Sequence, residues 1–221
     1  MKSELAFILD RSSSMESIRQ AAIDGFNTFL SDQQAAPGQN HFSLIFFDSG
    51  IETRLDSIPV AEALPLDLDS YVPCGCTALL DAIGDTIDRL GQRLAALPPA
   101  DRPEHVTLAI LTDGEENSSA RYTWHDVSQR IRHQIEIYSW EFLFLGAGED
   151  AIATAAKMHI PATHSSCYQA DAAGQHAAMA SFSRKITSSR QMKSGQATSE
   201  QQADADAALE QIVREEDQKR R

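Results

Sequence analysis

The amino-acid sequence predicts a doubly wound α/β fold, with a mostly parallel central sheet of about six strands and helices on both faces. Strand-like and helix-like segments alternate along the chain, which favours parallel β-α-β units. The strand segments are almost continuously apolar, as expected for strands that are buried on both faces. One turn, Asp48-Ser49-Gly50, joins two strand-like runs directly and predicts a hairpin, so one strand is expected to lie antiparallel at an edge.

The strand segments are short apolar runs that end at turn residues. The first of them stops at Asp10, and the fourth stops at Thr112-Asp113-Gly114. The last predicted strand, around residues 163–168, has the weakest apolar pattern. The predicted strands cover residues 5–9, 42–47, 51–55, 106–111, 140–145 and the region around 163–168.

The helices are predicted from apolar residues that recur every three or four positions. The clearest pattern runs from Leu79 through Ile83, Ile87 and Leu90, and Pro98-Pro99 ends it. The predicted helices cover residues 18–30, 79–97, 124–135, 151–158 and 172–189.

The composition changes after residue 190, so we expect one α/β domain over residues 1–190 and a tail over 191–221. Polar and small residues dominate the tail as far as Asp206. A narrow apolar stripe at Leu209, Ile212 and Val213 then stands among charged residues. This pattern predicts a flexible polar linker and a short charged C-terminal helix. It leaves open whether that helix is solvated or docks on the domain.

The net charge and the length of the apolar segments argue against several classes of function. The net charge of −13 disfavours nucleic acid and anionic membrane surfaces as partners. Apolar segments are too short for a signal peptide or a membrane span. Three cysteines, Cys74, Cys76 and Cys167, do not form a disulfide framework. We therefore expect a cytoplasmic protein.

Oxygen-bearing side chains follow two of the predicted strands and precede the clearest helix. Asp10, Ser12 and Ser14 follow the first strand, Thr77 precedes the helix, and Asp113 follows the fourth strand. Because parallel strands end at the same edge of a sheet, the first and third groups are expected to meet. Hydroxyls and carboxylates are hard ligands that suit Mg²⁺, with Mn²⁺ or Ca²⁺ as alternatives, rather than Zn²⁺.

This pattern resembles the von Willebrand factor A (VWA) family, whose metal-ion-dependent adhesion site (MIDAS) consists of Asp-x-Ser-x-Ser, then a Thr and then an Asp on three loops. The segments 75–83, 112–117 and 140–147 are also similar to small stand-alone bacterial VWA proteins, including those of tellurite-resistance clusters. The resemblance covers residues 4–190. The family often has Gly where this chain has Ser13.

The resemblance implies a Rossmann-like VWA fold and a metal site made by Asp10, Ser12, Ser14, Thr77 and Asp113. In the family the two serines touch the metal directly, the threonine does so in some states, and the aspartates act largely through water. An open coordination position then accepts an Asp or Glu from a protein partner. The implied function is a non-enzymatic, Mg²⁺-dependent protein-binding module.

Each motif also has a simpler interpretation. Ser13 with Glu16 fits a helix capping box, and Thr77 fits an N-cap. Cys74 and Cys76 are expected to be plain thiols, and Gly146-Ala147-Gly148 a strand-to-helix turn rather than a dinucleotide loop.

Three other functional interpretations compete with a binding module. A metal-assisted hydrolase or phosphatase is the main alternative, but the sequence offers no general base for it. An aspartyl phosphotransferase would need a second Asp where Ser12 stands. A structural subunit with an idle metal site is the third possibility. Acidic residues near the site, Glu115, Glu116 and Asp126, are expected to be solvated and to tune the approach of a partner.

Overall fold

The computed structural model describes residues 1–220 and contains one six-stranded sheet with the order β3-β2-β1-β4-β5-β6. All neighbouring strands are parallel except β2 and β3, which form an antiparallel hairpin at one edge. The predicted fold class is therefore confirmed. The strands are β1 (Lys2–Asp10), β2 (Gln39–Phe47), β3 (Ile51–Pro59), β4 (His105–Thr112), β5 (Glu141–Ala147) and β6 (Ser165–Tyr168).

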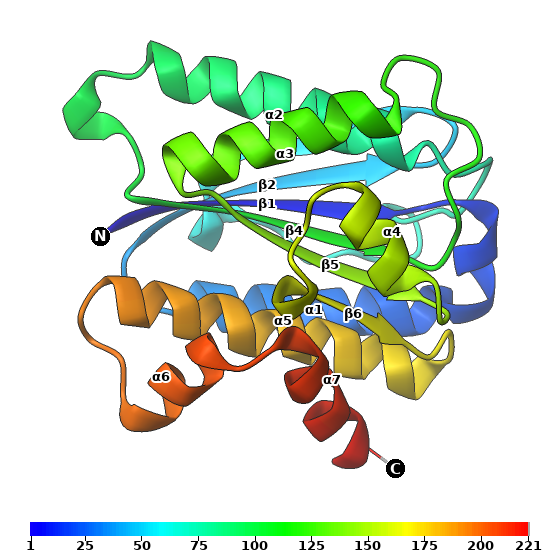
Figure 1. Cartoon of the computed structure of the whole chain (residues 1–221). Coiled ribbons are helices and arrows are strands. Elements are labelled where there is room, and N and C mark those ends of the chain that lie inside the picture. The colour runs from blue at the N-terminus through cyan, green and yellow to red at the C-terminus, as the bar shows by residue number, and fades with distance from the viewer. Residues whose placement is uncertain (221) are drawn as a thin grey trace.

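Helices cover both faces of the sheet, with α2, α3 and α4 on one face and α1 and α5 on the other (Figure 1). The helices are α1 (Arg19–Ala35), α2 (Leu79–Ala96), α3 (Trp124–Tyr138), α4 (Ala151–Lys157), α5 (Ala172–Lys193), α6 (Ser199–Asp206) and α7 (Leu209–Gln218). Short 3₁₀ turns are η1 (Ser13–Ile18), η2 (Val60–Glu62), η3 (Pro99–Asp101) and η4 (Ala162–His164).

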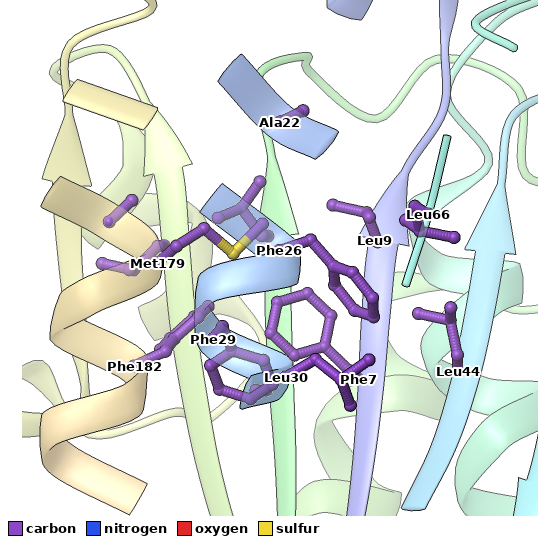
Figure 2. Close-up of a cluster of buried hydrophobic side chains, with 14 of the residues drawn as sticks. Phe7, Leu9, Ala22, Phe26, Phe29, Leu30, Leu44, Leu66, Met179 and Phe182 are labelled. Atoms are coloured by element: carbon purple, nitrogen blue, oxygen red, sulfur yellow. The ribbon is translucent and has the colours of Figure 1, made fainter. Parts of the chain in front are cut away.

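The period of two in β1 divides its side chains between the two cores. Phe7 and Leu9 join the cluster under α1 and α5, while Ala6 and Ile8 join the cluster under α2 and α3. Figure 2 shows the first cluster, where Phe7 packs edge-on against Phe26 and Phe182 with ring centroids 5.8 Å apart in each pair. Such buried aromatic contacts fix α1 and α5 on the sheet.

The register of the parallel strands sets the position of the site. Asp10 lies opposite Phe47 of β2, and Leu9 lies opposite Leu111 of β4. The last residue of β1 and the last residue of β4, Thr112, therefore come to the same edge of the sheet. The loops that follow both strands leave from this edge, at the right of Figure 1.

The Gly146–Gly148 segment is a strand-to-helix turn, as the simpler interpretation of its sequence predicts. β5 ends at Ala147, Gly148 has a φ of +89°, and α4 begins at Ala151. A left-handed φ of this kind favours glycine because a Cβ atom would be strained there.

The tail docks on the domain. Leu209 and Ile212 of α7 are fully buried against α5 and β6, and Arg184 of α5 forms ion pairs with Asp204 and Glu215. Helix α6 occupies part of the segment that the sequence predicts as a linker. The structure thus favours the docked alternative for the C-terminal helix, while the domain division at residue 190 stays a prediction. Within residues 1–220, no helix has the length and apolar character needed to cross a bilayer.

Candidate metal site

The three predicted loops converge at the C-terminal edge of β1 and β4. The Ser14 hydroxyl donates a 2.7 Å hydrogen bond to Oδ1 of Asp113, and the hydroxyls of Ser12 and Ser14 lie 3.0 Å apart. Ser12 and Asp10 are buried, whereas Ser14 is exposed. The group therefore runs from a buried end at Asp10 and Ser12 to an accessible rim at Ser14.

Asp10 lies at the buried end of this site and accepts hydrogen bonds from several donors. The backbone N–H of Ser12 donates to Oδ1 over 2.7 Å, and the Thr112 hydroxyl donates to Oδ2. The Tyr71 hydroxyl donates to the backbone carbonyl of Asp10. The sequence pattern does not indicate Thr112 or Tyr71 as part of the site. Thr112 directly precedes a predicted ligand, but nothing in the local sequence links Tyr71 to Asp10.

Thr77 reaches the same place from the loop before α2. Its backbone N–H donates to Oδ1 of Asn117 over 2.9 Å, and its carbonyl accepts from the Asn117 N–H over 3.1 Å. A Cβ atom added to Gly114 would lie 2.9 Å from the Thr77 hydroxyl oxygen and 3.6 Å from that of Ser14. Both hydroxyls therefore face Gly114, and all five predicted residues are brought together.

The first loop is held by contacts with the second. Ser13 donates both its N–H and its hydroxyl to the carbonyl of Gly75, over 3.2 and 2.9 Å. The predicted capping box of Ser13 and Glu16 is therefore not formed, because the Ser13 hydroxyl is used across the site. Thr77 is not an N-cap either, since α2 has Ala78 at that position. These hydroxyls are organised around the site rather than around helix ends.

The cysteines remain thiols, and all three are free. The Cys74 thiol donates to Oδ2 of Asp48 over 3.3 Å, and this hydrogen bond raises its pKa. Its backbone N–H donates to the Arg11 carbonyl over 2.8 Å. Cys74 thus supports the two loops as a neutral hydrogen-bond donor.

Two acidic residues near the site support the loop after β4, a role that the sequence did not reveal. Glu116, which we expected to be solvated, accepts hydrogen bonds from the Leu80 N–H and from Ser119. Asp81 of α2 accepts from three backbone N–H groups of residues 120–122. Asp126 caps α3 in a capping box with Thr123. These hydrogen bonds hold the loop that carries Asp113 against α2.

The electrostatics of the site favour an added positive charge. Burial raises the pKa of Asp10 to about 6, although hydrogen bonds from Thr112 and Ser12 oppose the shift. Burial also raises the pKa of Asp113. The neighbouring Arg11 is paired with Asp48 and Glu52 instead. Within residues 1–220, neither Asp10 nor Asp113 forms an ion pair with a basic side chain. Two partly desolvated carboxylates of this kind are an environment that a divalent ion stabilises.

The donor set fits a hard cation. In the described chain, no group of three or more His, Cys, Asp and Glu side chains is placed to hold a metal. The five converging residues instead offer two carboxylates and three hydroxyls. Mg²⁺ accepts such oxygen ligands and retains several waters. Asp10, Ser12, Ser14, Thr77 and Asp113 therefore fit the ion in number and chemistry.

Neither a model of a known protein family nor a curated protein matches this chain. Solved structures are similar in fold. Proximal thread matrix protein 1 from the mussel byssus, in a structure with zinc in its MIDAS motif, aligns with a TM-score of 0.56 and 16% identity over 84% of this chain. A von Willebrand factor type A protein from Catenulispora acidiphila aligns with a TM-score of 0.55 and 18% identity over 85% of this chain. The ArnB paralogue VWA2 from Sulfolobus acidocaldarius aligns with a TM-score of 0.51 and 17% identity over 85% of this chain.

These similarities define a VWA-like fold for this chain. The chain spans 46%, 43% and 44% of the length of the three structures. At such low sequence identity the comparison concerns the fold. The side chains of Asp10, Ser12, Ser14, Thr77 and Asp113 are what support a metal site in this chain.

Proposed function

We propose that this chain is a non-enzymatic protein-binding module that depends on a divalent cation, with Mg²⁺ held by Asp10, Ser12, Ser14, Thr77 and Asp113 in a MIDAS-type site. The observation that carries the proposal is the Ser14–Asp113 hydrogen bond, which joins loops 99 positions apart in the sequence. It brings hydroxyl and carboxylate oxygens from different strands to one accessible point. Sequence-local helix caps do not produce such a contact.

The partner is a protein that presents an Asp or Glu side chain. Mg²⁺ prefers six oxygen ligands, and a bound ion here would supply a positive centre that a carboxylate can join. The protein's part is to hold that centre open at the rim, where Ser14 is exposed and Asp113 is half-buried. The net charge of −13 makes the metal the feature that attracts an acidic side chain to an otherwise repulsive surface.

A binding role is preferred to hydrolysis because each hydrogen bond at the site is structural. Asp10 accepts from Ser12 and Thr112, and Asp113 accepts from Ser14. Within residues 1–220, no histidine makes a hydrogen bond to the five site residues, so no imidazole is poised as a general base there. A cytoplasmic location and a kinship with the tellurite-resistance VWA proteins stay predictions.

Metal binding is tested by titrating the purified chain with Mn²⁺ while electron paramagnetic resonance follows the free ion. We expect one saturable site from which Mg²⁺ displaces Mn²⁺. Asp113→Asn should weaken binding at least tenfold, because it removes one of two carboxylates at the site. Asp69→Asn is the matched control, since Asp69 is an exposed acid in the segment between β3 and α2. Equal affinities of the two variants would refute the assignment of the site.

A further inference from the structure

Two buried polar side chains at the sheet edge of the candidate metal site have no hydrogen-bond partner in the protein. Tyr168, the last residue of β6, is 4% exposed, and Gln175 of α5 is fully buried. In the described part of the chain, the Tyr168 hydroxyl and both polar atoms of the Gln175 carboxamide form no hydrogen bond. Burial of such groups without partners is costly, so they indicate a bound group that they serve.

The register of the sheet brings Tyr168 level with a candidate ligand. Thr112 of β4 lies opposite Gly146 of β5, and Tyr168 lies opposite Ala147, the next residue of β5. Asp113, which follows Thr112, is therefore level with Tyr168 at the edge where the parallel strands end. The single strand β5 separates the two residues.

Tyr168 also lies on the face of the sheet that Asp113 approaches. Its side chain belongs to the core cluster under α1 and α5, and the small side chain of Ala147 packs against the same cluster. Asp113 reaches this side through its hydrogen bond with Ser14 of η1, the turn that leads into α1. The Tyr168 ring can therefore extend over Ala147 towards Asp113.

The electrostatics of Tyr168 agree with this direction. Burial raises the pKa of its hydroxyl well above the usual value, and the charges of Asp113 and Asp10 add to the effect. Asp10 is on β1, three strands from β6, and neighbouring strands are about 4.8 Å apart. A hydroxyl that pointed away from the sheet would be too far from Asp10 to be affected.

Gln175 reaches the same edge from α5, which begins beside the tip of β6 at the right of Figure 1. Ala178 and Met179 of α5 lie in the core cluster under the sheet. Gln175 comes three and four positions before them, so it lies on the same helix face, one turn nearer to the start of the helix. Its carboxamide offers both a donor and an acceptor at this level.

We propose that Tyr168 and Gln175 are positioning residues of the metal site, which form hydrogen bonds to a water that the ion retains on its buried side. The proposal rests on the proposed function and adds two residues to the five candidate ligands. Mg²⁺ keeps several waters when it binds to proteins. A water polarised by the ion is a strong donor, and Oε1 of Gln175 and the Tyr168 hydroxyl oxygen accept from it. Such outer hydrogen bonds orient metal ligands and tune affinity.

The test measures Tyr168→Phe in two ways, by Mn²⁺ titration with electron paramagnetic resonance and by urea unfolding in EDTA. We expect the Mn²⁺ affinity to fall roughly tenfold, as for other residues that support metal ligands through hydrogen bonds. The free energy of unfolding in EDTA should stay the same or rise, because the lost hydroxyl has no protein partner. A tyrosine that serves only the fold would lower stability instead.

Gln175→Met gives an independent measurement, because it removes the carboxamide and keeps a side chain of similar length. We expect the same pattern, with weaker Mn²⁺ binding and undiminished stability in EDTA. Tyr138→Phe and Gln92→Met are the matched controls, since both residues are exposed, on α3 and α2 respectively. Neither control should change the Mn²⁺ affinity or the stability.

The outcomes distinguish this proposal from the one on which it rests. Wild-type Mn²⁺ affinity in Tyr168→Phe and Gln175→Met, with weakened binding in Asp113→Asn, overturns the positioning role and supports the metal site. A clear loss of stability in EDTA on Tyr168→Phe also overturns it, because the hydroxyl then serves the fold. Absence of Mn²⁺ binding by the wild-type chain contradicts the proposed function and this proposal with it.

Discussion

The hydroxyl of Ser14 donates to the carboxylate of Asp113 over 2.7 Å and thereby joins the loop after β1 to the loop after β4. Each residue belongs to a different strand end, and parallel pairing of β1 with β4 brings these ends together. The contact links the fold to the proposed function, because the same geometry that pairs the strands assembles the oxygen donors. The predictions below follow from this arrangement and from the contacts that support it.

Mg²⁺ should stabilise the folded chain through these residues. At a concentration about tenfold above the dissociation constant, a ligand specific for the folded state adds about 1.4 kcal/mol. For a chain of this size that corresponds to a rise in Tm of roughly 3–5 °C. Differential scanning fluorimetry with Mg²⁺ and with EDTA measures this change. Ser14→Ala should abolish most of the rise, while Ser17→Ala, on the same 3₁₀ turn, should keep it.

Gly114→Ala should weaken the site without unfolding the chain. The added Cβ atom would lie 2.9 Å from the Thr77 hydroxyl oxygen, so either the threonine or the loop must move. We expect at least a fivefold loss of Mn²⁺ affinity, since metal ligation depends on ligand positions to within a few tenths of an ångström. Gly91→Ala on α2 is the control, because the nearest atom to its new Cβ is 3.8 Å away. Unchanged affinity in Gly114→Ala would argue against Thr77 as a ligand.

Glu141 should make the stability of the chain sensitive to acid. Burial alone would raise its pKa, but the hydrogen bond and charge of His105, with charges on His164 and Lys193, lower it to about 2 from 4.5. A lowered carboxyl pKa adds stability that is complete above the unfolded value, near 4.5, and is lost as the pH falls towards 2. This contribution is up to about 3 kcal/mol at neutral pH.

The measurement for Glu141 is urea unfolding from pH 7 down to pH 2. Wild-type stability should fall through this window, whereas Glu141→Gln should start lower and depend less on pH between 4.5 and 2. Glu136→Gln, an exposed substitution on α3, serves as the control and should follow the wild type. Parallel curves for wild type and Glu141→Gln would show that the buried ion pair contributes nothing.

The docked tail should contribute to the stability of the domain. Ile212 of α7 is fully buried, so Ile212→Ala should lower the free energy of unfolding by about 2–4 kcal/mol. Ile137→Ala removes the same atoms from a side chain that is 62% exposed and should change stability by less than about 0.5 kcal/mol. Chemical denaturation compares the two variants. An equally small effect of both substitutions would mean that α7 does not pack on α5 and β6 in solution.

The fold could be predicted because its strands are apolar throughout and its turns are explicit. The run that ends at Asp10 and the run that ends at Thr112 both appear as strands of a doubly wound sheet, which brings the site residues to one edge. The candidate ligands could be predicted for the same reason, because they follow directly on clear strand ends or precede a clear helix. The sequence pattern identified Asp10, Ser12, Ser14, Thr77 and Asp113 as neighbours, and the structure places them together.

The supporting contacts could not be predicted, because they join residues that are distant in the sequence. The Ser13 hydroxyl bonds to Gly75, 62 positions away, although the local pattern with Glu16 favours a capping box. Asn117 forms hydrogen bonds with both the N–H and the carbonyl of Thr77, which lies 40 positions earlier in the sequence. Whether the C-terminal helix docks could not be predicted for another reason. The narrow apolar stripe at Leu209 and Ile212 does not by itself identify a surface against which it packs. Docking depends on the complementary surface of α5 and β6.

A crystal structure of the chain grown with Mn²⁺, with an anomalous difference map at the manganese edge, would show directly whether Asp10, Ser12, Ser14, Thr77 and Asp113 hold a divalent cation. We expect one peak within coordination distance, about 2.1–2.3 Å, of the Ser12 and Ser14 hydroxyls, with Asp10 and Asp113 in direct or water-mediated contact. Crystals grown with saturating Mn²⁺ that show no peak between Ser14 and Asp113 would contradict it.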